Sequence, residues 1–285
     1  FAYDPLGERY AELEEQPLVS IVIPAYNAEK TLKRMLDSVT GQTWQNTEII
    51  LVDDGSRDNT LQIAREAAER DARIQVHTQE NKGVSQARNT GMRFCTGKYI
   101  RFLDADDTLP PESTEILVNK AEKEASDLVI GGYKECLGSR EFRFNLENRD
   151  DTMTTSEMLP MLCRKANTYF YGVLWNKLFR RDIIEDMGLV FQDGLTYGED
   201  FAFHVTYLKK AERISFVKEY LYDYHRSMGS MTFRQAFSCV THPLRNIQTK
   251  VRLYHFLKDM YICRNEYGKY RKKLWLYLFK VGLDK

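Results

Sequence analysis

The sequence predicts an α/β fold with a mainly parallel, doubly wound, Rossmann-like sheet and a helical C-terminal extension. Short apolar runs rich in β-branched residues, at 18–24, 48–52 and 98–103, are typical of strands buried on both faces of a parallel sheet. Helical patterns separate these runs at a spacing that favours right-handed β-α-β crossovers. With 285 residues, the chain is long enough for one large domain or two small ones.

The first half of the chain repeats a strand–helix unit. Pro24 closes the first strand, because a proline cannot donate a hydrogen bond to a neighbouring strand. The helix that follows carries its large apolar side chains on one face. In order, the predicted elements are strand 18–24, helix 28–39, strand 48–52, helix 58–70, strand 74–77, helix 83–94, strand 98–103 and strand 127–132.

The pattern becomes less regular after residue 134. Aromatic and polar residues mix over 172–179, and we expect this segment to line one wall of a crevice. A loop at 194–200 leads into a helix, and the end of the chain is helical. In order, the predicted elements are an edge strand at 140–146, helices at 155–164 and 201–211, strands at 214–217 and 221–224, and helices at 233–260 and 267–283.

Composition argues against several classes of protein. The balance of 41 basic and 41 acidic residues disfavours a general nucleic-acid binder. No apolar stretch approaches the roughly 20 residues that span a bilayer, and the charged start of the chain is unlike a signal peptide. Five scattered cysteines are typical of free thiols in a reducing compartment. We therefore expect a soluble, cytoplasmic protein. Because the chain begins without Met and stops within a helical pattern, we also expect a fragment of a longer protein.

Three carboxylates, Asp104, Asp106 and Asp107, follow the strand at 98–103. Either they cap a helix that starts near residue 110, or Asp104 and Asp106 share a divalent cation that offsets their repulsion. Polar loops also follow the first three strands, and the carboxyl ends of parallel strands meet at one ligand-binding edge. This convergence favours the metal site and leaves Asp107 as the cap. The sequence has no G-x-G-x-x-G after the first strand and no G-x-x-x-x-G-K-[ST], so a nicotinamide dehydrogenase or P-loop NTPase is disfavoured.

These motifs resemble the family 2 glycosyltransferases, which have the GT-A fold. The resemblance covers about residues 18–108 and rests on VSIVIPAYN at 19–27, VDDGS at 52–56, NKG at 81–83 with ARNTG at 87–91, and the D-x-D at 104–106. It implies an inverting hexosyltransferase that takes a sugar from a nucleotide donor, usually a UDP-sugar, with Mn²⁺ or Mg²⁺ as cofactor. The acceptor it implies is a glycan, lipid-linked or protein-linked hydroxyl in the synthesis of a bacterial polysaccharide, capsule or glycoconjugate.

The resemblance also implies a set of donor-binding residues. Tyr26 would stack on the nucleobase beside Pro24, and Asp54 would accept a hydrogen bond from the uracil ring N–H. Alternatives stay open for two members, because residues 53–56 also suit an ordinary turn and Arg88 also suits an exposed helix surface. The implied donor-binding residues are Pro24, Tyr26, Asn27, Asp54, Asn81, Arg88 and Asp104.

Metal-binding and catalytic residues are implied in the same way. Asp106 would bind the metal directly, Asp104 would lie near the ribose or the metal's water shell, and His225 would help to hold the metal or the diphosphate unless it is only structural. Inversion in one displacement needs a single general base. Asp200 is the candidate and Glu199 the alternative, although both also suit the start of a helix, where the dipole favours carboxylates.

Assignments after residue 134 are fewer. Trp175 and Asn176 would contact the acceptor sugar, although a core tryptophan fits equally well. The basic, aromatic stretch at 267–283 would lie on the inner face of an anionic membrane, or pack on the catalytic domain or a second subunit. The implied organisation is a lead-in at 1–17, a nucleotide-sugar-binding half at 18–132, an acceptor-binding half at 133–230 and a helical extension at 231–285.

Two other functions compete with sugar transfer. A sugar-phosphate nucleotidyltransferase usually has a Gly- and Lys/Arg-rich loop after its first strand, where this chain has Ala-Tyr-Asn at 25–27. A non-catalytic module that only binds sugar nucleotides would not need the full set of carboxylates. The expected partners are therefore a nucleotide-sugar donor and an acceptor, and not a nucleic acid.

Overall fold

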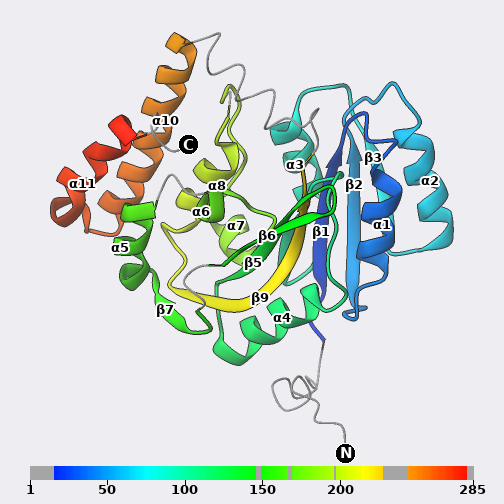
Figure 1. Ribbon diagram of the computed structural model, residues 1–285, viewed down its shortest axis with the longest axis horizontal. Helices are drawn as coiled ribbons and strands as arrows, with labels where there is room; N and C mark the ends of the chain where they lie inside the picture. The colour runs from blue at the N-terminus through cyan, green and yellow to red at the C-terminus, as the bar shows by residue number, and fades with distance from the viewer. Residues whose placement is uncertain (1–15, 146–148, 166–168, 196, 227–242, 281–285) are drawn as a thin grey trace, which may run out of the picture.

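The computed structural model describes residues 16–145, 149–165, 169–195, 197–226 and 243–280, and a mixed nine-stranded sheet runs through its centre (Figure 1). The strands are β1 (Val19–Ala25), β2 (Thr47–Asp53), β3 (Ile74–Thr78), β4 (Tyr99–Phe102), β5 (Leu128–Leu137), β6 (Arg140–Phe144), β7 (Thr152–Thr154), β8 (Lys177–Arg180) and β9 (Arg213–His225). Their spatial order is β3-β2-β1-β4-β8-β5-β9-β7, and β6 pairs with β5. The predicted α/β class is confirmed.

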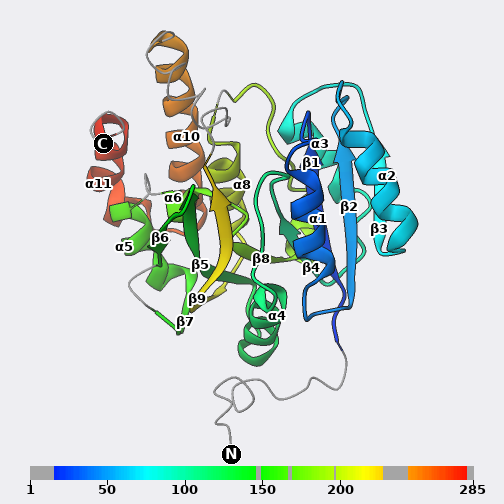
Figure 2. The same ribbon diagram turned by 45° about the vertical axis from the view of Figure 1, so that its right-hand side comes forward.

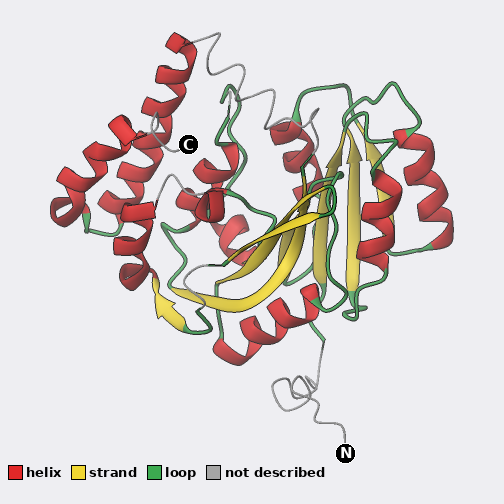
Figure 3. Cartoon of the chain, in the orientation of Figure 1, coloured by secondary structure: helices red, strands yellow, loops and turns green. Residues whose placement is uncertain are grey.

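Helices flank the sheet and gather at one end of it (Figures 2 and 3). They are α1 (Leu32–Thr40), α2 (Thr60–Arg70), α3 (Val84–Met92), α4 (Ser113–Glu124), α5 (Thr155–Lys165), α6 (Tyr169–Gly172), α7 (Arg181–Asp186), α8 (Glu199–Tyr207), α10 (Pro243–Cys263) and α11 (Tyr267–Lys280). The pair α1 and α2 lies beside β2 and β3, whereas α10 and α11 lie at the opposite end of the molecule.

The strands β1 to β4 form a parallel block. β1 pairs with β2 and β4, and β2 pairs with β3, in parallel register throughout. Every residue of β1 and β4 is buried, which explains their continuous apolar sequences. The one charged residue in these two strands is Arg101, which is also buried. It donates hydrogen bonds to the hydroxyls of Thr114 and Ser113 at the start of α4. The carboxyl ends of all four strands therefore meet at one edge.

The second half of the sheet differs from the prediction in two places. The sequence pattern does not predict β8 as a strand, yet β8 pairs antiparallel with both β4 and β5 and joins the two halves of the sheet. The segments at 214–217 and 221–224 belong to one strand, β9, because bulges against β5 accommodate the polar residues between them. Gly132 permits one bulge, since a Cβ there would lie 2.9 Å from the carbonyl oxygen of Glu219.

Two helices, α1 and α8, start at residues other than those that the sequence pattern suggests. The backbone N–H of Ala28 donates to Thr60 Oγ1 and that of Glu29 donates to Asp58, so residues 28–31 tie two loops together before α1 begins. Conversely, α8 begins at Glu199, earlier than the predicted start at 201. The predicted helix at 233–260 is present as α10, and its first ten predicted residues lie outside the described part of the chain.

The C-terminal helices pack as a pair on the rest of the protein. Tyr261 of α10 meets Tyr270 of α11 edge to face, with ring centroids 5.4 Å apart, and Leu257 and Leu274 are buried beside them. Among the described residues, no helix has both the length and the apolar character that crossing a bilayer requires. The predicted lead-in at 1–17 falls almost entirely outside the described residues.

Candidate active site

The loops after β1, β2 and β3 bind one another and form one continuous edge, which we call the donor edge (residues 24–29, 53–60 and 79–83). The backbone N–H of Asp54 donates to Ala25 O at 2.8 Å, and that of Gln79 donates to Asp53 O at 3.0 Å. Gly55 has φ +71°, and a Cβ there would lie 2.9 Å from Asn81 N. Only glycine therefore lets the second loop pack against the third.

Asp54 is buried, and its carboxylate organises the third loop. Its oxygens accept hydrogen bonds from Gln79 Nε2 at 2.7 Å, Lys82 N at 2.9 Å and Gly83 N at 2.8 Å. The neighbouring Asp53, which the sequence did not single out, has a buried Oδ1 without a hydrogen-bond partner among the described residues. Of these two adjacent carboxylates, Asp54 is therefore bound by the third loop, whereas Asp53 keeps one buried oxygen without a partner among the described residues.

Other predicted donor-binding residues differ in exposure. Tyr26 is 47% exposed, and Asn27 and Asn81 are exposed as well, whereas Pro24 is buried at the end of β1. Asn27 adopts φ +50°, and its Oδ1 accepts a hydrogen bond from Arg57 N. Among the predicted donor-binding residues, Tyr26 and Asn81 therefore have side chains that lie open along this edge.

Arg88 joins the D-x-D to the predicted base. Its Nη2 donates to Asp104 Oδ1 at 2.9 Å, and its Nη1 donates to Asp200 Oδ1 at 2.5 Å. The guanidinium lies 5.3 Å from the ring centroid of Phe191, and the side chain is only 4% exposed. The alternative of an ordinary exposed helix arginine is therefore wrong. We call this arrangement the Asp104–Arg88–Asp200 bridge.

Burial and charge shape the acidity of this cluster. Burial raises the pKa of Asp200 to about 7; Arg88 opposes this effect, and the carboxylates of Glu199 and Asp104 add to it. Burial followed by the Asp104 charge raises the pKa of Asp106 to about 6. Burial lowers the pKa of Arg88, but Asp200 and Asp104 outweigh this and raise it, so Arg88 stays protonated.

Asp107 is fully buried and anchors the D-x-D turn to β9. Its carboxylate accepts hydrogen bonds from the hydroxyl of Tyr222 at 2.6 Å and from the backbone N–H of His225 at 2.7 Å. The prediction that Asp107 caps the next helix is wrong, because α4 starts six residues later at Ser113 and has no side-chain cap. Its real partners lie more than a hundred residues away, which no local pattern reveals.

His225 lies beside the D-x-D turn. Its Nε2 is 2.9 Å from Thr108 Oγ1, and the backbones of Thr108 and Asp223 exchange hydrogen bonds of 3.2 and 2.9 Å. Burial and the nearby charge of Arg34 lower the pKa of His225, which favours the neutral imidazole. The length of β9 thus brings the predicted histidine to the predicted aspartates.

Arg34 is a residue of this site that sequence reasoning missed. It lies on the exposed face of α1, where helical periodicity predicts ordinary solvent-facing charge. Its Nη2 donates to the carbonyl oxygen of Asp106 at 2.6 Å, and its charge acts on both Asp106 and His225. Only the position of α1 in the fold could have identified it.

The residues around the D-x-D fit a cation that arrives with a diphosphate. Within the described residues, no group of three or more His, Cys, Asp or Glu side chains forms a ready-made metal site. Among those same residues, however, no side chain donates a hydrogen bond to the Asp106 carboxylate and no cation lies within ion-pair distance of it. Mg²⁺ typically uses one or two carboxylates together with substrate phosphates, which matches such a sparse protein contribution.

Trp175 and Asn176 lie in the core, which corrects the prediction that they contact the acceptor. Trp175 is 2% exposed and stacks on Tyr222 with ring centroids 4.3 Å apart. Asn176 is fully buried, its Nδ2 donates to Gly131 O, and its Oδ1 accepts from Lys177 Nζ. Trp175 packs against β9 and Asn176 binds the backbone of β5, so neither presents a surface to a sugar.

This combination of a parallel strand block, a D-x-D at its edge and a carboxylate-bearing helix start defines a GT-A fold. The chain belongs to glycosyl transferase family 2, whose model matches residues 20–188, and it is a glycosyltransferase. It is 34% identical over 263 residues to the uncharacterized glycosyltransferase EpsJ of Bacillus subtilis (strain 168), covering 88% of this chain and 76% of that protein.

Solved structures share the same fold. TarS 1–349 of S. aureus in complex with UDP-GlcNAc matches with a TM-score of 0.66 at 20% identity, covering 88% of this chain and 73% of that one. The mannosyltransferase PcManGT of Pyrobaculum calidifontis, in complex with GDP-Man and Mn²⁺, matches with a TM-score of 0.57 at 17% identity, covering 95% and 77%.

Proposed function

We propose that this glycosyltransferase is inverting and metal-dependent, and that it transfers a sugar from a UDP-sugar to a hydroxyl of a glycan, lipid-linked or protein-linked acceptor. The observation that carries the proposal is the Asp104–Arg88–Asp200 bridge. It holds one carboxylate of the D-x-D and the candidate base on the same guanidinium. Donor phosphates and an acceptor hydroxyl can then meet within one small site.

The preference for uridine rests on Asp54. A carboxylate at the nucleobase accepts a hydrogen bond from the ring N–H of uracil, a donor that cytosine lacks at the same place. Asp54 is fixed by three hydrogen bonds, and Tyr26 is exposed nearby at the end of β1. TarS was solved with a UDP-sugar and PcManGT with a GDP-sugar, so the fold itself accepts either kind of base.

In the proposed reaction, the acceptor oxygen attacks the anomeric carbon and the bond from that carbon to the diphosphate oxygen breaks. The acceptor proton passes to the Asp200 carboxylate, and the bonding electrons leave with the diphosphate. Arg88 orients Asp200 through the 2.5 Å hydrogen bond. Glu199, at the first position of α8, is the second candidate for the same role.

Asp106 would hold the metal, with Asp104 and His225 beside it. When bound, a divalent cation would offset the negative charge that develops on the leaving diphosphate. Arg34 keeps the Asp106 turn in place through its carbonyl oxygen. Asp104 and His225 are themselves fixed, by Arg88 and by Thr108 respectively. These contacts hold the proposed metal-binding residues in place before a donor arrives.

A panel of nucleotide sugars with Mn²⁺ or Mg²⁺ tests the proposal. We expect hydrolysis or transfer with a UDP-sugar, and weaker UDP binding in calorimetry when EDTA is present. Asp106→Asn should abolish turnover and remove the difference between Mn²⁺ and EDTA. Folded protein that turns over no nucleotide sugar with either metal would contradict the proposal, as would an Asp106→Asn variant with unchanged metal dependence.

We further propose that α11 contacts an anionic lipid surface and so brings the site near membrane-borne acceptors. The α11 sequence contains five basic residues and no acidic one, in a chain whose overall charge is balanced. Tyr270 packs on Tyr261 of α10 and Leu274 is buried, whereas Trp275 and Leu276 are 55% and 50% exposed, with Trp275 beside Arg271 and Lys272. Basic side chains around exposed apolar ones are typical of helices that lie on a membrane.

Vesicle flotation tests this contact. The protein should float with vesicles of phosphatidylcholine mixed with phosphatidylglycerol, but not with phosphatidylcholine alone, and high salt should release it. Arg271→Gln/Lys272→Gln should abolish flotation, whereas the exposed pair Arg65→Gln/Arg70→Gln on α2 should not. Unchanged flotation of the α11 variant would overturn the proposal. A stable dimer that α11 substitutions disrupt would overturn it in favour of a second subunit.

A further inference from the structure

The segment that leads into Glu199 and Asp200 is fixed from two sides. We call residues 193–195 and 197–198 the base-bearing segment. It ends at Gly198, which caps α8 with φ +80° and whose carbonyl oxygen accepts the N–H of Ala202 at 2.9 Å. Because the first turn of α8 begins at this point, the path of the segment sets where the Asp200 carboxylate lies.

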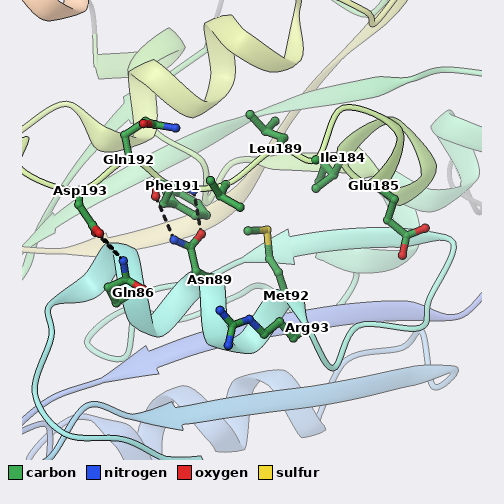
Figure 4. A pocket seen from close by; sticks show the side chains of 12 residues that line it. Gln86, Asn89, Met92, Arg93, Ile184, Glu185, Leu189, Phe191, Gln192 and Asp193 are labelled. Atoms are coloured by element: carbon green, nitrogen blue, oxygen red, sulfur yellow. Dashed lines mark hydrogen bonds between the residues drawn. The ribbon is translucent and has the colours of Figure 1, made fainter.

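α3 holds one side of this segment (Figure 4). Gln86 Nε2 lies 2.6 Å from both carboxylate oxygens of Asp193. One turn further along α3, the Asn89 side chain exchanges two hydrogen bonds with the backbone of Phe191, of 2.9 and 2.8 Å. These residues line a groove of about 580 Å³ that contains none of the predicted site residues. The same helix carries Arg88, so α3 positions Asp200 both directly and through the chain before it.

α10 holds the other side. Arg252 Nη1 donates to the carbonyl oxygen of Gly194 at 2.9 Å, and its Nη2 donates to that of Asp193 at 3.3 Å. Leu253, the next residue of α10, is buried against Gly198, where an added Cβ would lie 2.6 Å from Leu253 Cδ1. Consecutive residues of α10 therefore contact both ends of the base-bearing segment.

We infer that α10 is part of the catalytic apparatus, with Arg252 and Leu253 as positioning residues for Asp200. This inference rests on the proposed role of Asp200 as general base. Arg252 fixes two carbonyl oxygens that precede the helix, and Leu253 fixes the cap residue itself. Small displacements of a catalytic group lower turnover strongly, since reactions depend on near-attack geometry. In Figure 2, α10 lies far from the donor edge. Loss of the contacts that Arg252 and Leu253 make should therefore affect the proton-transfer step and spare donor binding.

Arg252→Ala is the direct test. We expect kcat to fall by about tenfold to a hundredfold, while the KM for the donor and the affinity for UDP stay within about twofold. Arg252→Lys should recover part of kcat, because a lysine still reaches one carbonyl oxygen. Turnover is measured with the best nucleotide sugar from the donor panel, and UDP affinity by calorimetry.

Arg264→Ala is the matched control. Arg264 directly follows α10 and donates to Leu208 O at 2.9 Å and to Glu212 at 2.6 Å, so its contacts lie just past the end of α8 that is remote from Asp200. It should lower thermal stability at least as much as Arg252→Ala and leave kcat unchanged. Equal kcat values for the two variants would overturn the inference. An active Asp200→Asn enzyme would instead overturn the proposed base, so the two failures are distinguishable.

A glycine pair provides the second test. Gly198→Ala places a methyl group against Leu253 at φ +80°, whereas Gly138→Ala meets nothing within 4 Å at φ +60°. Both changes strain the backbone, but only the first presses on α10. We expect Gly198→Ala to lower kcat and Gly198→Ala/Leu253→Ala to recover part of it, with Gly138→Ala unchanged. A loss that the double variant does not relieve, or an unaffected Gly198→Ala, would contradict the role of Leu253.

Discussion

The donor edge and the base-bearing segment are held in different ways. At the donor edge, Asp54 binds backbone groups of the next loop in the same parallel block, 28 and 29 positions along the chain. The base-bearing segment and the Asp200 that follows it depend on distant contacts, with Arg88 and Asp200 separated by 112 positions and Arg252 and Gly194 by 58. The first region needs only adjacent β-α units, whereas the second needs the whole fold. Donor binding and proton transfer should therefore fail separately.

The largest expected effect comes from Asp200→Asn. Removing a general base costs about 10²- to 10⁴-fold in rate, and the asparagine still fills the space and accepts the hydrogen bond from Arg88. We expect kcat to fall into that range while UDP affinity stays near normal. Glu199→Gln is the control and should lose far less. Wild-type turnover in Asp200→Asn would place the base elsewhere.

Arg88→Gln should damage both donor binding and proton transfer, because Arg88 binds Asp104 of the D-x-D as well as Asp200. Its loss leaves two partly buried carboxylates without their cation, and breaking a buried ion pair in this way costs about 3–5 kcal/mol. Urea unfolding measures this cost, and turnover should fall as well. Arg73→Gln removes the pair with Asp71, in which the arginine is 23% exposed rather than the 4% of Arg88, and should cost much less. Equal losses of stability would argue against a special role for the bridge.

The acidity of Asp200 predicts a pH dependence of turnover. Since the base acts in its deprotonated form and its pKa is about 7, kcat should fall by about tenfold per pH unit below that value and level off above it. Glu199→Gln removes a neighbouring negative charge and should move this acidic limb of the pH profile of kcat to lower pH. Arg88→Gln removes the cation and should move it to higher pH. A limb that moves in neither variant would mean that another group titrates.

Asp54→Ala tests the donor edge alone. The change removes the acceptor for Lys82 N and Gly83 N and the proposed contact with uracil. We expect UDP affinity to fall about tenfold, equivalent to roughly 1.4 kcal/mol, and the preference for UDP over CDP to disappear, with kcat at saturating donor nearly unchanged. Competition binding of UDP and CDP measures both effects. An unchanged preference would remove Asp54 from nucleobase recognition.

The smallest effect on activity should come from Trp175→Phe. Trp175 is buried in an aromatic stack, so we expect a loss of stability of about 1–3 kcal/mol and no change in turnover or acceptor use. Trp275→Phe, at a 55% exposed position of α11, should change stability by less than about 0.5 kcal/mol. A Trp175 variant of normal stability but altered acceptor use would restore the original prediction.

Sequence reasoning succeeds where a motif and its physical consequence lie within one β-α unit. The apolar runs of β1 and β2, the polar loops that follow them and the D-x-D at 104–106 are all of this kind, and their convergence follows from parallel topology. It fails where a side chain's partner is remote. The local sequence predicts Asp107 as a helix cap, whereas its carboxylate binds Tyr222 and His225. Arg34 and Arg252 occupy ordinary positions on helices, and only the fold shows which distant residues they contact.

Sequence reasoning also could not predict which residues in the second half of the chain are buried. Trp175 and Asn176 sit in a mixed aromatic and polar segment that suits a ligand surface as well as a core. β8 follows directly and is only four residues long, too short for a periodic pattern to reveal it. Once β8 pairs with β4 and β5, the two residues before it have to lie inside.

Parallel measurement of UDP affinity and turnover in Asp200→Asn and Asp54→Ala tests the separation of the two regions most directly. Calorimetry with Mn²⁺ present reports donor binding, and release of UDP from a saturating UDP-sugar reports turnover. We predict that Asp200→Asn keeps UDP affinity within about twofold and loses turnover, and that Asp54→Ala loses affinity and keeps turnover at saturation. Loss of both affinity and turnover in either variant would contradict the claim that donor binding and proton transfer depend on separate regions. Wild-type turnover in Asp200→Asn would contradict it as well.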